Sequence, residues 1–174
     1  MRYGFYLPTR GRSAEPDALE TLVTRGEALG FHSTVIADHV VFPVTIASKY
    51  PYTVSGAFPG GGDALEQLTL MSFVAAKSTR LRLITSVMIL PHRNPVLTAK
   101  MLATIDVLSR GRVTVGVGVG WLREEFAALG AAASRDRRST PTPTRAPSSS
   151  LPQSAPCARG SPSALRSGNR RSAR

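Results

Sequence analysis

The chain has 174 residues, 42% of them hydrophobic, which is enough for one domain with a buried core. Its net charge of +11 is uneven, because residues 1–130 carry 13 basic and 10 acidic side chains, whereas residues 131–174 carry nine arginines and one acid, Asp136. The single cysteine, Cys157, excludes an intrachain disulfide, and neither a signal-peptide pattern nor an apolar run of about 18 residues is found, so we expect a cytoplasmic protein without membrane contact.

The first elements in chain order alternate between strand and helix. Residues 2–7 form a short apolar run before Pro8 and predict a strand. Residues 17–29 predict a helix that ends at Gly30, the usual position for glycine just past a helix end. Residues 32–39 predict the next strand, because three β-branched residues stand in their centre. The expected buried face of the helix consists of Leu19, Leu22, Val23 and Gly26.

The alternation continues to residue 130. Residues 65–77 predict a second helix, residues 81–90 a third strand, residues 96–109 a third helix that follows an N-cap and first-turn proline at Asn94-Pro95, and residues 112–119 a fourth strand. The stripes expected to be buried are Leu65, Leu68, Ser72 and Ala75 in the second helix, and Leu97, Met101, Ile105 and Leu108 in the third.

These four β/α units predict an α/β fold. Strands that are apolar throughout, separated by amphipathic helices, indicate a parallel sheet covered by helices. Periodicity alone leaves two architectures open, a small doubly wound sheet and half of a (β/α)8 barrel. The long segment 40–63 follows the second strand and is expected to be a lid, a binding loop or a disordered loop at the edge where such folds place ligands.

The stretch RVTVGVGVGWLREEFAALG, residues 112–130, looks like a nucleotide-binding loop but fails on spacing. The dinucleotide pattern G-x-G-x-x-G would need its third glycine at Trp121 or at Arg123. Three glycines instead alternate with valines, which on a strand places Gly116, Gly118 and Gly120 on one face. That face admits close approach either by a flat ligand or by packed neighbours. The segment REEF then begins another helix, with its two glutamates in the first turn.

The residues most suited to chemistry are Asp38 and His39, at the end of the second strand. A carboxylate beside an imidazole at this edge of a parallel sheet can take part in proton transfer, and the alternative is that Asp38 caps the loop while His39 packs against an aromatic ring. We expect His32 and His92 to be ordinary surface or loop residues. The three histidines lack metal-ligand spacing, so no metal site is expected.

Several motifs together resemble the luciferase-like family of flavin- or deazaflavin-dependent oxidoreductases. In chain order they are YGFYLPTRG, EALGFHSTVIADHVVFP, IASKYPY, LRLITSVMILPHRNPVLTAKMLATIDVLSRGR and VGVGVGWLREEFAALG. The Asp-His pair, the RNP before the third helix and the segment GVGWLREEF particularly resemble the branch that uses coenzyme F-420. The resemblance covers about residues 1–130.

The resemblance implies a TIM-type (β/α)8 barrel, of which residues 1–130 would be the N-terminal half. It implies hydride transfer between coenzyme F-420, or alternatively FMN, and a small organic substrate, or monooxygenation with reduced flavin and oxygen. Intact relatives are expected to be homo-oligomers. The resemblance also implies a non-proline cis peptide bond at Ser86-Val87. From the residues alone, this dipeptide is expected to be part of an ordinary buried strand. Some relatives that use the deazaflavin carry an acid just after the fourth strand, where this chain has Trp121. The resemblance therefore does not support proton transfer by a residue at that position.

The resemblance also implies a set of site residues around the cofactor ring. It places Asp38 and His39 beside the ring as catalytic residues, with His39 as proton donor or ligand. The cofactor-binding residues it implies are Asp38, His39, Ser86, Val87, Gly118, Gly120 and Trp121. From the residues alone, Tyr50, Tyr52 and Phe58 of the long loop either line an apolar pocket or simply pack.

Residues 131–174 read as a disordered tail rich in Arg, Ser, Pro and Ala. They contain no Val, Ile, Phe, Tyr, Trp or Met, so they cannot bury enough apolar surface to offset the entropy of ordering. Such a composition is typical of GC-rich DNA read out of frame, which favours a frameshift near codon 130 over a genuine tail. The chain would then lack half of the barrel and have weak or no activity, or be an inactive fragment. Nucleic-acid binding by the arginines is an alternative, disfavoured because the tail has no aromatic residue for base stacking.

Overall fold

The computed structural model describes residues 1–131, which form a parallel sheet and its helices. The strands are β1 (Gly4–Leu7), β2 (Ser33–Ile36), β3 (Arg82–Ile89) and β4 (Val113–Gly118). The helices are α1 (Pro16–Ala28), α2 (Gln67–Lys77), α3 (Pro95–Leu108) and α4 (Arg123–Ala128), with short 3-10 turns η1 (Arg12–Ala14) and η2 (Leu90–His92). The predicted tail, 131–174, and the proposed frameshift lie outside the described residues, apart from Ala131.

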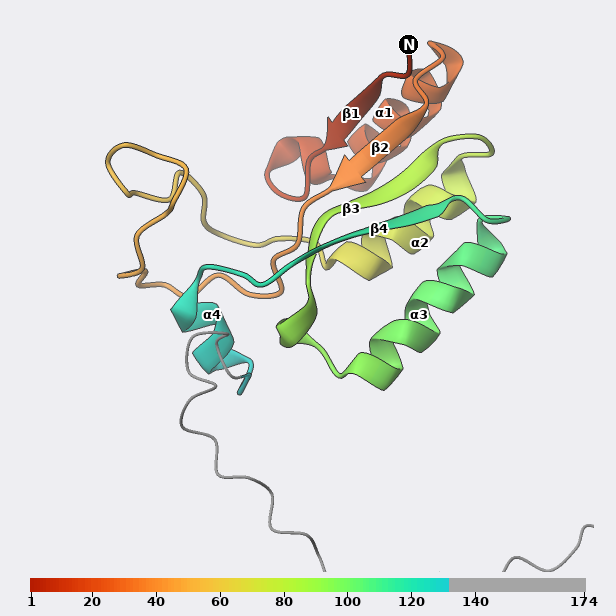
Figure 1. Ribbon diagram of the computed structural model, residues 1–174. Helices are drawn as coiled ribbons and strands as arrows, with labels where there is room; N and C mark the ends of the chain where they lie inside the picture. The colour runs from red at the N-terminus through yellow and green to blue at the C-terminus, as the bar shows by residue number, and fades with distance from the viewer. Residues whose placement is uncertain (132–174) are drawn as a thin grey trace, which may run out of the picture. The chain divides into compact units, whose positions relative to one another are not determined.

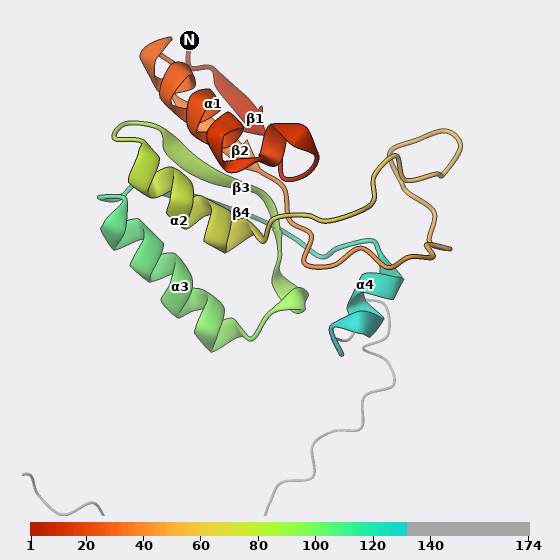
Figure 2. The same cartoon turned by 180° about the vertical axis from the view of Figure 1, so that it is seen from behind.

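The strands stand in the order β1-β2-β3-β4 and every neighbouring pair is parallel. Figures 1 and 2 show α1, α2 and α3 side by side on one face of this sheet. A doubly wound sheet would carry helices on both faces, so the arrangement is that of consecutive units of a (β/α) barrel. The predicted α/β fold with four β/α units is confirmed.

The core fills the space between the sheet and the three long helices. Strand residues contribute to this core, among them the register partners Leu7 and Ile36, and Leu83, which pairs with Thr34 two residues earlier on β2. They meet the buried faces of the helices, whose largest contributors are Leu19, Val23, Leu68, Met71, Val74 and Ile105. Removal of this apolar surface from water is the main stabilising contribution to such a layer packing.

Local signals set two of the helix boundaries as predicted. Asn94 is the N-cap of α3, and its side-chain oxygen accepts hydrogen bonds from the backbone N–H groups of Val96 and Leu97. Pro95 occupies the first turn, where its missing N–H leaves no helical bond unmade. Gly30 follows α1 with φ of 82°, a left-handed conformation that glycine adopts without steric cost.

The predicted buried stripes are partly correct: α1 buries Leu19, Val23 and Gly26, but Leu22 is 38% exposed, and Ser72 of α2 is exposed as well. Leu65 precedes α2 and is 40% exposed, whereas α2 buries Gln67, Leu70, Met71 and Val74 beside the predicted Leu68 and Ala75. On α3, Leu97 and Leu108 are 60% and 68% exposed. The reason is that α3 contacts the sheet and α2 along one narrow line through Thr98 and Ile105, and no described element covers its other flank.

Arg112 joins three elements at the end of the sheet where the strands begin. Its guanidinium donates hydrogen bonds to the carbonyl oxygens of Ala75, Ser78, Leu81 and Ser109 at 2.6–2.9 Å, and to the Ser78 hydroxyl at 2.8 Å. Ala75 and Ser78 belong to the end of α2, where carbonyl groups lack helical partners. One side chain therefore caps α2 and fixes the starts of β3 and β4.

Candidate functional site

A cleft of about 470 Å³ opens where β2, β3 and β4 end. Parallel strands bring their carboxyl ends to one edge, so residues that are distant in sequence meet there. The cleft is lined by all seven predicted site residues, namely Asp38, His39, Ser86, Val87, Gly118, Gly120 and Trp121. Tyr50 and Tyr52 of the long loop also line it, so two of the three predicted loop aromatics face a pocket.

The peptide bond between Ser86 and Val87 is cis, as the family resemblance implied. The register between β3 and β4 shifts between Thr85 and Met88, so this dipeptide bulges out of the ladder. Ser86 is exposed and Val87 is 44% exposed, so the alternative of an ordinary buried strand segment is wrong. The bulge presents its side chains to the cleft.

The glycine face of β4 packs against this bulge. A Cβ on Gly116 would lie 2.5 Å from the backbone oxygen of Thr85, and a Cβ on Gly118 would lie 2.6 Å from Cγ2 of Val87. The Thr85 hydroxyl also donates to the Gly116 oxygen and accepts from its N–H. Close approach of the neighbouring chain, one of the two interpretations of the glycines, is therefore found at Gly116 and Gly118, while Gly118 also lines the cleft. It lets Val87 sit against the backbone of β4.

His39 is held by a carboxylate from the far end of the described chain. Nδ1 of His39 lies 2.9 Å from Oε2 of Glu125, in the first turn of α4. The other oxygen of Glu125 accepts hydrogen bonds from the backbone N–H groups of Val40 at 2.7 Å and Val41 at 3.2 Å. Burial alone would raise the pKa of the Glu125 carboxyl, but the hydrogen bonds from His39 and the amides outweigh burial and hold that pKa below its ordinary value.

Aromatic rings surround the His39 imidazole. The ring centroids of Phe42, Phe58 and Trp121 lie 4.4, 5.6 and 6.5 Å from that of His39. Tyr50 packs against Trp121 at 4.9 Å. The long loop and the segment after β4 thus build one apolar wall, in which the imidazole is a polar group that can exchange a proton.

Asp38 is engaged in a buried ion pair. Its two oxygens accept hydrogen bonds of 2.6 Å each from the guanidinium of Arg93, and one also accepts from the Ile89 N–H at 2.8 Å. Arg93 donates further to Glu66 at 2.7 Å. Burial would lower the pKa of Arg93, but its bonds to Asp38 and Glu66 raise it, so the guanidinium stays charged. These contacts tie the end of β3 to the end of β2.

A model of the luciferase-like monooxygenase family matches residues 1–142 of this chain. The chain belongs to the luciferase-like monooxygenase family. The uncharacterized protein Rv0953c of Mycobacterium tuberculosis is 33% identical over 139 residues, which are 79% of this chain and 48% of that protein. The chain therefore spans about half the length of this curated relative.

Two solved structures show the luciferase-like fold of the chain. The oxygenating constituent of 3,6-diketocamphane monooxygenase from Pseudomonas putida, solved with FMN, matches with a TM-score of 0.54 at 18% identity, over 75% of this chain and 32% of that one. The coenzyme F420 dependent tetrahydromethanopterin reductase of Methanopyrus kandleri matches with a TM-score of 0.50 at 22% identity, over 74% of this chain and 30% of that one.

In this luciferase-like chain His92 lies in the turn η2 between β3 and α3, but it is buried, so the prediction of a surface position is wrong. The imidazole packs edge-on against Phe126 at 4.6 Å, and neither ring nitrogen has a hydrogen-bond partner within residues 1–131. Its Nδ1 lies 3.9 Å from Oε1 of Glu125, which is too far for a hydrogen bond. Burial lowers the pKa of His92, so the ring is neutral at pH 7. His32 stays half-buried at the other end of β2.

The first turn of α4 also holds the long loop of this luciferase-like chain, which passes beside α4 in Figure 1. One oxygen of Glu124 accepts from the backbone N–H groups of Ala47 at 3.0 Å and Ser48 at 2.9 Å. The Arg123 N–H donates to the Ser48 hydroxyl at 3.3 Å. Glu125 binds the backbone amides of residues 40 and 41, so α4 holds the loop at two points. The loop is therefore fixed in position as one wall of the cleft.

Sequence reasoning missed Glu125 and Arg93 as residues of this luciferase-like site. The sequence placed Glu125 correctly in a helix first turn and explained it by the helix dipole, which is a local effect. A signal was nevertheless present, because an acid just after a parallel strand lies at the same edge as Asp38 and His39. Arg93 likewise lies in the short connection after the third strand, directly behind the turn η2.

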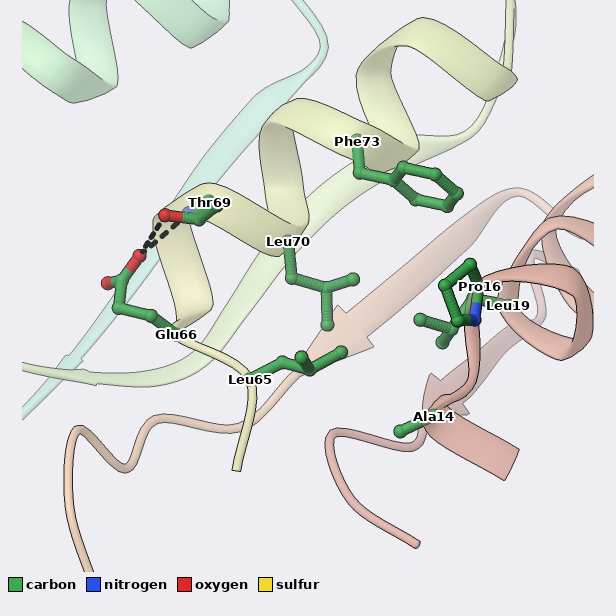
Figure 3. Close-up of a pocket in the computed structure, with 8 residues that line it drawn as sticks. All are labelled: Ala14, Pro16, Leu19, Leu65, Glu66, Thr69, Leu70 and Phe73. Atoms are coloured by element: carbon green, nitrogen blue, oxygen red, sulfur yellow. Dashed lines mark hydrogen bonds between the residues drawn. The ribbon is translucent and has the colours of Figure 1, made fainter. Parts of the chain in front are cut away.

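A second pocket of this luciferase-like chain, of about 290 Å³, lies between the start of α1 and α2 (Figure 3). Leu19, Leu65 and Leu70 point toward one another there, with Phe73 at one end. Glu66 stands at its rim and accepts hydrogen bonds from the N–H and hydroxyl of Thr69. Since Glu66 also binds Arg93, the ion-pair chain to Asp38 connects the two pockets.

Within residues 1–131, no group of three or more His, Cys, Asp or Glu side chains is placed to hold a metal ion. No helix in that part of the chain combines the length and apolar character that crossing a bilayer requires.

Proposed function

We propose that the cleft binds the tricyclic ring of coenzyme F-420, or alternatively of FMN, and that the chain serves hydride transfer between this ring and a small organic substrate, or monooxygenation. The observation that carries the proposal is the convergence of His39, the Ser86-Val87 bulge and the end of β4 on one cleft. Family membership supports a flavin-type oxidoreductase. Enzymes of the same fold are named with FMN and with F420, which supports both cofactors.

The lining of the cleft fits a flat heterocycle. Its volume lies in the range of roughly 300–1,000 Å³ that is usual for small-molecule sites. Val87, Trp121 and Tyr50 offer apolar surface, and the backbone of residues 117–120 offers amide groups. These residues would hold the ring, which supplies the hydride-carrying centre when bound.

His39 is the residue we propose for proton transfer. Its imidazole lies in the cleft wall, and an imidazole exchanges protons near neutral pH. The catalytic role predicted for Asp38 stays a prediction. Because both Asp38 oxygens are bound by Arg93 and Ile89, we propose that Asp38 acts by positioning the end of β3 beside the ring.

The part of the cleft that residues 1–131 form offers no positive charge for a phosphate tail. None of the described residues that line it is Lys or Arg. We therefore propose that the described residues contact the ring and contribute little to the binding of the phosphate. Binding by the 174-residue chain is expected to be weaker than micromolar, and its activity weak or absent.

Trp121 gives a direct test, because it is the chain's single tryptophan and lines the cleft. The full chain is titrated with FMN, with riboflavin, and with coenzyme F-420 while tryptophan fluorescence is followed. We expect saturable quenching, with riboflavin and FMN within about threefold of each other because the cleft has no cationic partner for the phosphate. The tighter of F-420 and FMN identifies the cofactor.

Two matched variants decide whether the cleft is the site. Val87→Glu places a charge at the cleft wall and should weaken binding at least about tenfold, since an unpaired charge against an apolar ring is unfavourable. Val107→Glu makes the same change on the exposed flank of α3 and should leave binding unaltered. Absence of saturable quenching with all three ligands, or equal binding by both variants, would overturn the proposal.

A further inference from the structure

The buried carboxylate of Glu125 is the starting point. Its side chain has no exposed surface, yet it sits in a helix of only six residues, Arg123–Ala128. A buried carboxylate is costly unless charged or polar partners surround it. Three donors meet it here: the His39 imidazole on Oε2 and the backbone amides of Val40 and Val41 on Oε1.

The two oxygens are therefore committed to different partners. An ionised carboxylate only accepts hydrogen bonds, so the His39 nitrogen that faces it must carry a proton. That nitrogen is Nδ1, at 2.9 Å from Oε2. The neutral imidazole then has its lone pair on Nε2, and protonation adds the second proton at Nε2.

Nε2 is the nitrogen left for chemistry. Within residues 1–131 it makes no hydrogen bond, and the His39 side chain is 16% exposed where it lines the cleft. Phe42 at 4.4 Å packs against the ring and limits its rotation. The imidazole is thus oriented with one nitrogen bound and one available.

The other charged and titratable groups near Glu125 do not replace it. Asp38 is paired with Arg93, and Glu124 binds loop amides at residues 47 and 48. His92 approaches Oε1 only to 3.9 Å and is buried without a hydrogen-bond partner in the described chain. Glu125 is thus the carboxylate that contacts His39.

We propose that Glu125 is the positioning residue of the site, which holds the proton on Nδ1 of His39 and so makes Nε2 the proton-exchanging atom in the cleft. The significance of that atom rests on the proposed function. The tautomer itself is a property of the cofactor-free chain, so it is measured independently of cofactor binding.

The experiment is long-range ¹H–¹⁵N correlation NMR of the histidine rings in the cofactor-free 174-residue chain at pH 8. The chain has three histidines, and His39→Gln assigns the relevant signals by their loss. We expect Nδ1 of His39 to show the shift of a protonated ring nitrogen and Nε2 that of an unprotonated one. A wild-type His39 with its proton on Nε2 overturns the proposal, whatever the variants do.

Glu125→Gln sharpens the test, because the amides of Val40 and Val41 require an oxygen and would orient the new side chain. Its NH₂ group would then face His39, so Nδ1 becomes an acceptor and the proton moves to Nε2. Glu124→Gln, the matched control one residue away, should leave the His39 tautomer unchanged. An unchanged tautomer in folded Glu125→Gln, or the same inversion in Glu124→Gln, contradicts the assignment.

Discussion

Both carboxylate oxygens of Asp38 accept a 2.6 Å hydrogen bond from Arg93, which joins the ends of β2 and β3 below the cleft. The Asp38 side chain is fully buried and that of Arg93 is 13% exposed. Because removal of one partner leaves a buried charge uncompensated, Arg93→Met should lower the free energy of unfolding by about 3–5 kcal/mol. Urea denaturation followed by circular dichroism measures it.

The control for this pair is Glu66→Gln. Its side chain is 32% exposed, and the single oxygen of the new amide can keep either the hydrogen bond to Arg93 or the N-cap bond from Thr69. The loss in stability should therefore be about 0.5–2 kcal/mol, the effect of losing an N-cap, and smaller than that of Arg93→Met. Equal losses for Arg93→Met and Glu66→Gln would show that the Asp38 carboxylate does not depend on its arginine.

A second prediction concerns the cap formed by Arg112. An ammonium group has three protons and cannot reproduce the planar fork that reaches the end of α2 and the start of β3. Arg112→Lys should therefore lower the free energy of unfolding by about 1.5–3 kcal/mol, the effect of losing charged hydrogen bonds to carbonyl groups. Lys100→Arg, on an exposed position of α3, is the matched control and should change stability little. Thermal unfolding compares the two.

The two glycines of β4 should respond differently to alanine. At Gly116 the added methyl group would meet the backbone oxygen of Thr85, which cannot move without disturbing β3. At Gly118 it would meet only the end of the Val87 side chain. We expect Gly116→Ala to be the more destabilising variant, by about 1–3 kcal/mol, and Gly118→Ala to displace Val87. The prediction is wrong if chemical denaturation ranks them the other way round.

The stability of the fold should fall in two stages as the pH drops. Burial holds the pKa of His92 below its ordinary 6.5, so the unfolded chain binds more protons than the folded one below that pH and stability begins to fall. For Glu125 and Glu66, burial raises the pKa but hydrogen bonds lower it further, below the ordinary 4.5. Their contribution is complete above that pH and is lost as the pH falls through the folded-state values.

The first stage can be isolated with His92→Leu, which removes the titrating ring from its apolar contact with Phe126. Free energies of unfolding measured from pH 8 to pH 4 should lose their slope between about 6.5 and 5 in this variant. The slope below 4.5 should remain. A wild-type profile that is flat between pH 8 and pH 5 would contradict a neutral, buried His92.

The sequence was sufficient to predict those parts of the structure that a local signal determines. The N-cap at Asn94, the helix end at Gly30 and the β-branched run of β2 each act within a few residues. The cleft at Asp38 and His39 was also predictable, since the order of elements alone brings strand ends together. The His39–Glu125 bond was not, because nothing local relates residues 86 positions apart. The exposure of Leu97 and Leu108 depends on which neighbours cover α3, which periodicity does not encode.

The two glutamates of α4 determine which part of the chain is needed to hold His39 and the long loop in place. A fragment ending at Gly120 would retain every strand and the three long helices, and would lose α4. It would therefore lack the carboxylate beside His39 and both anchors of the 40–63 segment. The part of the chain that builds the sheet and the part that fixes His39 and the long loop thus differ by a helix of six residues.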